Sequence, residues 1–288
     1  MTRRSGTLLL LLAAITVGSP VRAADSDQGA ANGFTERWFA MSDAAKEAQP
    51  HWVTPLMTVS ARLEQGYRYD QNWQSRANGV DLTNYGGGKG LQLIPTANTE
   101  LIIGVAAYQT RTTPQATEHG WADETLLLKY RVLAADEEHG NRIVTSSLGV
   151  SLPSGSKAFT NHDAIVTPTI AVGQGWGSRA QGVDIQSTLG VAVPIAHRRT
   201  RGMPIAWNTA LQAHVFEKLW PEIEANYTHY RDGPNDGHHQ LAVTAGVIAG
   251  RFAVTPRLRL TVGGGYQKAV SSFRTFEHTW LVTARASF

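Results

Sequence analysis

The sequence HTWLVTARASF, residues 278–288, carries the strongest evidence on the fold class. One set of its residues recurs at every second position: Trp280, Val282, Ala284, Ala286 and Phe288. The set between them is Leu281, Thr283, Arg285 and Ser287. Because successive side chains of a β-strand point to opposite faces, this pattern predicts a strand with one apolar face and one face that carries charge.

The end of this strand also resembles a sorting signal. Bacterial outer-membrane barrels carry an alternating last strand with a final aromatic residue, which the barrel-assembly machinery reads. We therefore expect Trp280, Val282 and Phe288 to form an insertion signal, with that machinery and outer-membrane lipid as partners. The expected location is the outer membrane of a Gram-negative bacterium.

The same alternation recurs along the chain after Thr54. Leu126, Leu128 and Tyr130, for example, alternate with Lys129 and Arg131. Such segments predict twelve strands, at residues 57–70, 88–95, 99–111, 121–133, 142–154, 164–176, 182–196, 204–217, 221–231, 239–253, 257–270 and 275–288. Mostly tight turns at one end alternate with generally longer loops at the other, the longest at residues 71–87. Membrane barrels with periplasmic turns and extracellular loops have this organisation.

The predicted fold is therefore all-β: a transmembrane, antiparallel, up-and-down barrel of about 12 strands. Aromatic residues such as Trp121, Trp176 and Trp207 lie near the predicted strand ends, where an interfacial girdle would need them. Closure of the sheet leaves no unpaired edge in lipid. An even number of strands places both ends of the barrel in the periplasm.

Three regions precede or form this barrel. Residues 1–23 have a basic start, an apolar run and small residues before a cleavage point, as a signal peptide does. Residues 24–53 form an N-terminal periplasmic or plug segment, with helical periodicity over 34–49. Residues 54–288 form the barrel. The helical segment has two interpretations, a cap or interfacial helix outside the lumen and a plug inside it.

Composition excludes several classes of function. The chain has no Cys, which excludes disulfide scaffolds and thiolate metal sites. Cleavage after Ala23 would remove Arg3, Arg4 and Arg22, leaving 23 basic and 23 acidic residues. No basic patch remains to indicate a nucleic-acid partner. No cofactor and no metal site is implied.

Charged side chains on the polar faces of the predicted strands should point into the lumen. A charge at the lipid midplane is unfavourable by about 2–4 kcal/mol, so these side chains must avoid lipid. The residues concerned are Arg62, Glu64, Lys129, Arg131, Glu222, Glu224, Arg259 and Arg285. They could form a structural network of ion pairs, or they could in addition select a solute.

Two motifs resemble a known family. One is GWADETLLLKYR at residues 120–131, and the other is SLGVSLPSG at residues 147–155. Together they resemble the outer-membrane family named after a meta-pathway of phenol degradation, although Ala122 and Ser154 depart from its pattern. Its members are described as channels for aromatic or hydrophobic compounds. The resemblance implies passive uptake of such small molecules, without enzymatic activity.

Two other functions stay open at this point. A barrel hydrolase of the lipase type would need a nucleophile beside a His, and Ser156 with Asn161, His162 and Asp163 is the best material in the sequence. No Gly-x-Ser-x-Gly elbow occurs, so we assign no catalytic residue. A structural or translocator barrel is the other alternative.

Overall fold

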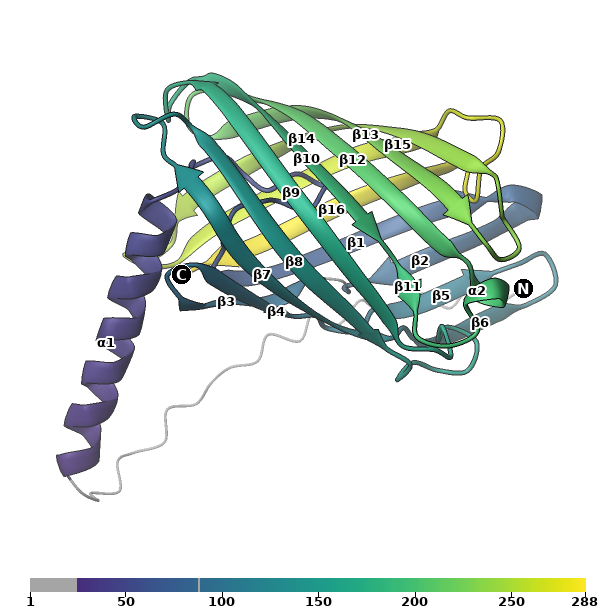
Figure 1. Cartoon of the computed structure of the whole chain (residues 1–288), viewed down its shortest axis with the longest axis horizontal. Helices are drawn as coiled ribbons and strands as arrows, with labels where there is room; N and C mark the ends of the chain where they lie inside the picture. The colour runs from purple at the N-terminus through teal and green to yellow at the C-terminus, as the bar shows by residue number, and fades with distance from the viewer. Residues whose placement is uncertain (1–24, 88) are drawn as a thin grey trace, which may run out of the picture. The chain divides into compact units, whose positions relative to one another are not determined.

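A computed structural model describes residues 25–87 and 89–288, and residues 66–288 form a closed antiparallel β-barrel (Figure 1). The strands are β1 (Gly66–Arg76), β2 (Val80–Tyr85), β3 (Gly90–Thr96), β4 (Thr99–Ile103), β5 (Tyr108–Thr112), β6 (Thr117–Trp121), β7 (Glu124–Ala135), β8 (Arg142–Leu152), β9 (Ile165–Gly177), β10 (Gly182–Val191), β11 (Val193–Pro194), β12 (Met203–His214), β13 (Leu219–Arg231), β14 (His239–Ala253), β15 (Arg259–Ala269) and β16 (His278–Ser287). The expected signal peptide, residues 1–23, lies outside the described residues.

These sixteen segments combine into twelve barrel strands, because four strands are interrupted. β2 and β3 both pair with β1, and β4 and β5 continue that order on their far side. β6 and β7 together form the next strand, and β10 and β11 both pair with β9. The predicted fold class, a transmembrane-type barrel of twelve antiparallel strands, is confirmed.

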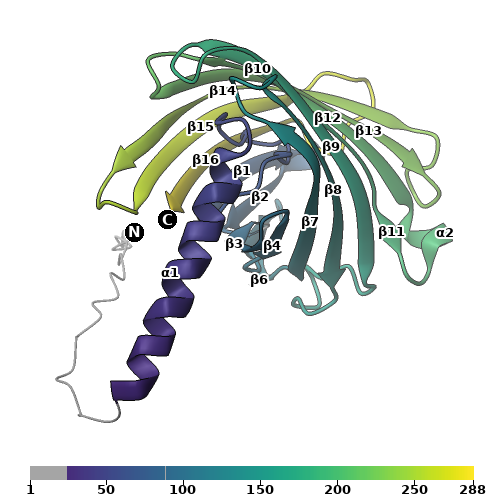
Figure 2. The ribbon, with the colours of Figure 1, turned by 60° about the vertical axis from the view of Figure 1, so that its left-hand side comes forward.

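The first and last strands close the barrel. β16 pairs with β1 in a continuous register from Gly66 opposite Ser287 to Ser75 opposite His278. Figure 2 shows the sheet curving round until these two strands lie side by side. Every strand therefore has two hydrogen-bonded neighbours along at least part of its length, which is the condition for exposing strands to lipid.

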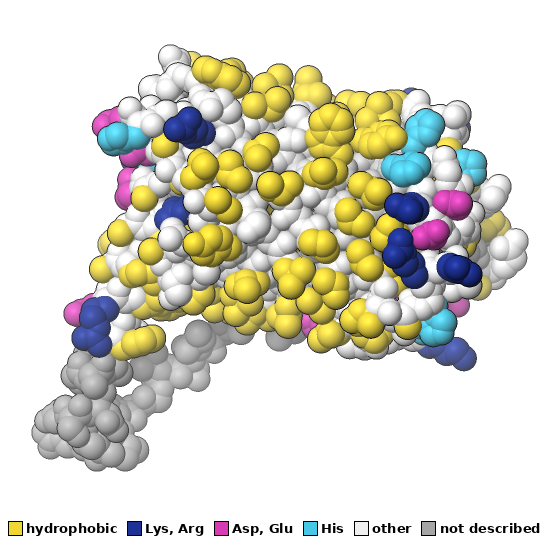
Figure 3. Space-filling model, viewed as in Figure 1, with side chains coloured by type: hydrophobic (Ala, Val, Ile, Leu, Met, Phe, Trp, Pro, Cys, Tyr) yellow, Lys and Arg dark blue, Asp and Glu magenta, His cyan; other side chains and the backbone are white. Residues whose placement is uncertain are grey.

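The exterior of the barrel is apolar and the interior is polar. Leu128 on β7 and Ile223 on β13 point outward, with 51% and 60% of their surfaces exposed. Figure 3 shows apolar side chains spread over the middle of the wall, with charged side chains gathered toward its two ends. Among the described residues, 30 buried polar or charged residues outnumber 19 buried apolar ones. This inversion of the usual arrangement fits a wall surrounded by hydrocarbon.

The two ends of the barrel differ in their connections. At the end where β1 begins and β16 finishes, the turns are short, residues 97–98, 178–181 and 215–218 among them. At the other end, residues 153–164 and 270–277 form longer loops. By the rule for outer-membrane barrels, the end with the short turns is the periplasmic end.

Two expectations for the start of the barrel are wrong. Residues 57–65 are not strand, because β1 begins only at Gly66. Ala61 and Leu63 alternate with Arg62 and Glu64, so a strand here would turn them to lipid, but they lie buried inside the barrel, 1% and 0% exposed. The expected loop at residues 71–87 instead forms most of β1 and β2, which are joined by a short helical turn, Ala77–Gly79.

Two helices accompany the barrel. Helix α1 (Asp25–Glu47) covers residues 34–47 of the predicted helical segment 34–49. Its residues 38–47 belong to the same compact unit as the barrel, whereas residues 25–37 belong to a second unit. Helix α2 (Arg198–Arg201) is a single turn in a loop. Within residues 25–87 and 89–288, no helix combines the length and apolar character needed to cross a bilayer.

Candidate functional site

Residues 48–65, here called the plug segment, occupy the lumen. The segment leaves the end of α1, enters the barrel from the periplasmic end and returns there to begin β1 (Figure 1). Its two arms are clasped together, because the Gln49 side chain donates to the Leu63 carbonyl at 2.8 Å and accepts from the Leu63 amide at 3.0 Å. Pro50 and Pro55 lack the amide donors that a strand needs, which disfavours a regular strand here.

Two carboxylates of the wall hold the tip of the plug segment. Glu222 Oε1 accepts the amide of Leu56 at 2.9 Å. Glu224 accepts the amides of Met57 at 2.7 Å and Thr58 at 2.6 Å. Both glutamates lie on the inner face of β13, where alternation with Ile223 places them, and both are buried. Three backbone donors without strand partners are thus satisfied by side-chain acceptors of the wall.

Two arginines of the wall hold the same turn from the carbonyl side. Arg68 on β1 donates to the carbonyls of Pro55 at 3.2 Å and Leu56 at 2.7 Å. Arg285 on β16 donates to Pro55 at 3.2 Å and to the carbonyl of Thr54. Because guanidinium groups only donate and carboxylates only accept, the wall matches both kinds of backbone group at the tip.

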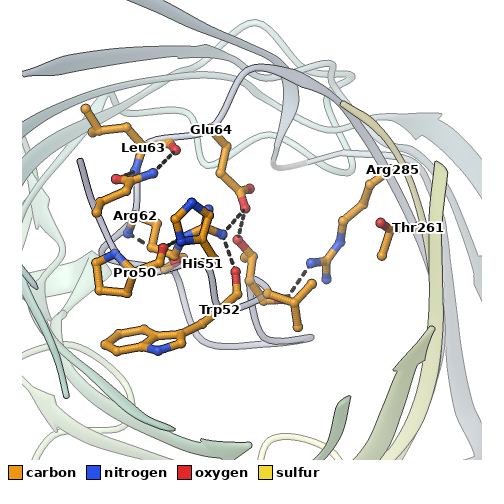
Figure 4. A network of polar contacts seen from close by, with 12 residues as sticks. Pro50, His51, Trp52, Arg62, Leu63, Glu64, Thr261 and Arg285 are labelled. Carbon is orange, nitrogen blue, oxygen red and sulfur yellow. Dashed lines mark hydrogen bonds and ion pairs between the residues drawn. The ribbon is translucent and has the colours of Figure 1, made fainter. Parts of the chain in front are cut away.

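A buried ionic cluster holds the returning arm. Lys129 Nζ lies 3.0 Å from Glu100 Oε2 and 3.1 Å from the carbonyl of Arg62. Glu100 also accepts the Glu64 amide at 3.1 Å. Arg62 itself turns back on the entering arm, donating to the carbonyls of Pro50 and Trp52, and lies 3.5 Å from Glu64 (Figure 4).

Apolar side chains of the plug segment fit against glycines of the wall. Trp52 is fully buried, and a Cβ added at Gly173 on β9 would collide with its ring. Leu56 lies in the same way against Gly246 on β14, and a Cβ at Gly265 on β15 would lie 2.8 Å from its Cδ1. Gly265 is the last of three consecutive glycines, residues 263–265, and its missing side chain makes room for Leu56 inside the barrel.

The eight predicted lumen residues fall into three groups. Five lie buried on the inner face of the wall: Lys129, Arg131, Glu222, Glu224 and Arg285. Arg62 and Glu64 lie inside the barrel as well, but on the plug segment rather than on the wall. Arg259 is exposed at the periplasmic rim, where β15 begins. A role of these residues in guiding a solute stays a prediction.

Three further residues of the network were missed. Arg68, Glu100 and Arg251 are charged residues on strands, and each contacts the plug segment directly. Arg251 donates to the Trp52 carbonyl at 2.7 Å from a bulge in β14. A single charged residue within an otherwise apolar strand could have indicated these lumen positions. In Thr99–Ile103, for example, Glu100 precedes three apolar residues.

The periplasmic turn at residues 136–141 holds the entry of the plug segment. Glu137 accepts the His51 amide at 2.6 Å and lies 2.8 Å from His51 Nδ1. Burial alone would raise the pKa of Glu137, but the hydrogen bonds from His51 outweigh it and lower the pKa to about 2 from 4.5. The ionised carboxylate therefore stabilises the docked entry, and this stabilisation is lost only in acid.

Protection of the His51 amide should depend on pH in a defined window. Because the folded pKa of Glu137 is lowered, its contribution is complete above about 4.5 and disappears as the pH falls toward about 2. Glu137→Gln should lower the hydrogen-exchange protection factor of His51 about tenfold at neutral pH, since hydrogen bonds to charged groups contribute roughly 1.5–3 kcal/mol. The exposed neighbour Glu138 provides the control, Glu138→Gln, which should change nothing. If the His51 protection factors of wild type and Glu137→Gln differed by the same amount at every pH down to 2, the assignment would be refuted.

The two family-like motifs dock onto each other. Asp123 accepts the amides of Gly155 at 3.0 Å and Asn161 at 2.8 Å. Ser156 Oγ accepts the Trp121 amide at 2.9 Å. The motifs thus fasten the loop after β8 to the junction between β6 and β7, near the extracellular end.

The residues considered for a hydrolase site make other contacts in the structure. Asp163 pairs with His197 at 3.1 Å and with Arg201 at 3.4 Å. Ser156 makes its side-chain contact to a backbone amide rather than to a His. Within the part of the chain that the structure describes, no group of three or more metal-ligating side chains gathers.

Comparison with known proteins supports the fold. No protein-family model matches the chain, and no curated protein matches it by sequence. Among solved structures, an outer-membrane channel from Pseudomonas putida F1 superimposes with a TM-score of 0.56 at 14% identity, covering 82% of this chain and all of that one. The fold is that of an outer-membrane β-barrel. The translocator domain of the autotransporter NalP from Neisseria meningitidis gives 0.49 at 12% identity, covering 92% of this chain and 97% of that one. The NanC porin gives 0.43 at 10% identity, covering 76% and 98%.

Similarity to solved structures at such low sequence identity shows the fold alone. The location of the protein follows from this fold together with the apolar outer surface of the barrel. A closed barrel with an apolar exterior satisfies its backbone without water and presents hydrocarbon-like side chains to its surroundings. The predicted location in the outer membrane is therefore confirmed. Insertion through Trp280, Val282 and Phe288 stays a prediction, although Trp280 and Val282 do face outward.

Proposed function

We propose that this chain is an outer-membrane channel for passive diffusion of small, aromatic or otherwise hydrophobic compounds, in which the plug segment obstructs the lumen between passages. The observation that carries the proposal is the way the plug segment is held. Its tip donates hydrogen bonds to Glu224 of the wall and accepts them from Arg285, and water can replace these bonds when the segment moves.

The class of solute rests on a separate argument. The motifs at residues 120–131 and 147–155 resemble the phenol-degradation family, whose members are described as channels for aromatic or hydrophobic compounds. In this chain the same motifs fasten an extracellular loop, through Asp123 and Ser156, next to the barrel mouth. A firmly held loop at the mouth suits a channel that admits small molecules and excludes larger ones.

Planar-bilayer recordings and vesicle uptake test the proposal. The purified full-length chain should give small single-channel currents, and vesicles that contain it should take up phenol derivatives faster than protein-free vesicles. Absence of both current and uptake would refute the channel. Lipid hydrolysis that Ser156→Ala abolishes would instead establish the enzyme.

A further inference from the structure

A cavity of about 510 Å³ opens at the periplasmic end of the barrel. It lies between the plug segment, the end of α1 and the periplasmic ends of β14, β15 and β16. Its lining contains eight Lys or Arg side chains against four Asp or Glu side chains. The volume is in the range of sites that enclose small organic molecules.

Half of these basic side chains are already neutralised by carboxylates. Asp43 pairs with both Lys46 at 2.9 Å and Arg257 at 2.8 Å. Arg179 lies 3.3 Å from Glu47, and Arg62 lies 3.5 Å from Glu64. These pairs contain three of the four acidic side chains of the cavity, Glu217 being the fourth, and leave its positive excess to other residues.

Four basic side chains of the cavity have no carboxylate partner among the described residues: Lys218, Arg251, Arg259 and Arg285. Arg285 donates hydrogen bonds to Thr283 and to carbonyls of the plug segment, and Arg251 donates one to the carbonyl of Trp52. The side chain of Arg259 makes no hydrogen bond or ion pair with any described residue. Since a guanidinium carries five N–H donors, Arg251 and Arg259 keep most of theirs available.

We propose that this cavity binds a small organic carboxylate, held by Arg259 and Arg251. The planar guanidinium fork matches a carboxylate with two parallel hydrogen bonds. Apolar residues of the cavity lining, Val53 and Pro256, would contact the organic part of the ligand. An excess of one sign of charge in a recess also concentrates the opposite ion.

This inference deepens the proposed function, because it makes an aromatic carboxylate the preferred solute. Binding to this cavity can, however, be measured without transport.

Calorimetric titration of the full-length protein in detergent measures binding directly, with benzoate and with benzamide, a neutral molecule of the same shape. Benzoate should bind at least about tenfold more tightly than benzamide, which corresponds to one charge-assisted contact.

Variants separate this site from general attraction of anions. Arg259→Gln should weaken benzoate binding about tenfold, since the side chain is exposed and its loss leaves the barrel intact. Arg142, exposed at the same rim where β8 begins but outside the cavity, gives the control Arg142→Gln, which should bind as wild type does. Equal binding of benzoate and benzamide, or equal loss in both variants, would overturn the proposal. Arg259-dependent binding without any channel current or solute uptake would support this site and refute the channel.

Discussion

Replacing Glu224 with alanine is expected to free the tip of the plug segment and raise channel activity sharply. The substitution removes the acceptor of two backbone amides, those of Met57 and Thr58, at 2.7 Å and 2.6 Å. Each hydrogen bond to a charged group contributes roughly 1.5–3 kcal/mol, so the docked state should lose about 3 kcal/mol or more. This loss corresponds to a change of about 100-fold in the ratio of displaced to docked plug.

Single-channel recording measures this change as open probability. Glu224→Gln keeps an acceptor without the charge, and should lie between wild type and Glu224→Ala. Glu124 at the start of β7 provides a matched control, since its side chain is exposed and makes no hydrogen bond or ion pair with the plug segment among the described residues. Open probability that stays at the wild-type value in Glu224→Ala would show that these bonds do not hold the obstruction.

Replacing Trp52 with alanine should loosen the entering arm while leaving the barrel wall unchanged. Trp52 is fully buried against Ile143 and Ala171 as well as Gly173. Removing such a ring typically destabilises a packed site by about 3–5 kcal/mol. Hydrogen exchange over residues 48–65 should therefore increase strongly, whereas exchange in β7 to β16 and the heat-modifiable migration of the barrel on gels should not change.

A second substitution at the same contact makes this prediction specific. Gly173→Val would place side-chain atoms where the Trp52 ring now lies, and should by itself displace the entering arm. In the Trp52→Ala background the same change should have little further effect, because the ring it displaces is absent. Additive effects of the two substitutions would contradict direct packing, since only residues in contact show strong coupling.

How far the sequence predicts the fold depends on what surrounds each segment. In β7 and β13 one face meets lipid and the other meets the lumen, so Lys129 and Glu224 stand out among apolar neighbours. The second half of β1 and β2 extends toward the extracellular end with polar residues on both faces, and therefore resembles a loop. Alternation fails as a signal where the outer face no longer meets hydrocarbon.

The plug segment shows the opposite case, an alternating sequence that is not a membrane strand. Val59, Ala61 and Leu63 alternate with polar residues as a membrane strand would, yet they lie within the lumen. Alternation of apolar and polar residues indicates that the two faces of a segment have different surroundings. It does not show whether the apolar face contacts lipid or the inside of the barrel wall. The charges of the wall were predictable, but their partners were not, because Glu222 binds an amide 166 residues away in sequence.

The most direct test of the account is to lock the plug segment to the wall. The chain has no Cys, so Leu56→Cys with Gly246→Cys introduces a single possible disulfide, at a place where the Leu56 side chain touches the Gly246 position. Conductance and uptake should be absent in the oxidised double variant and return on reduction, while each single-cysteine variant should be insensitive to the reductant. Equal conductance of the fully cross-linked and reduced forms would contradict a lumen that opens by movement of residues 48–65.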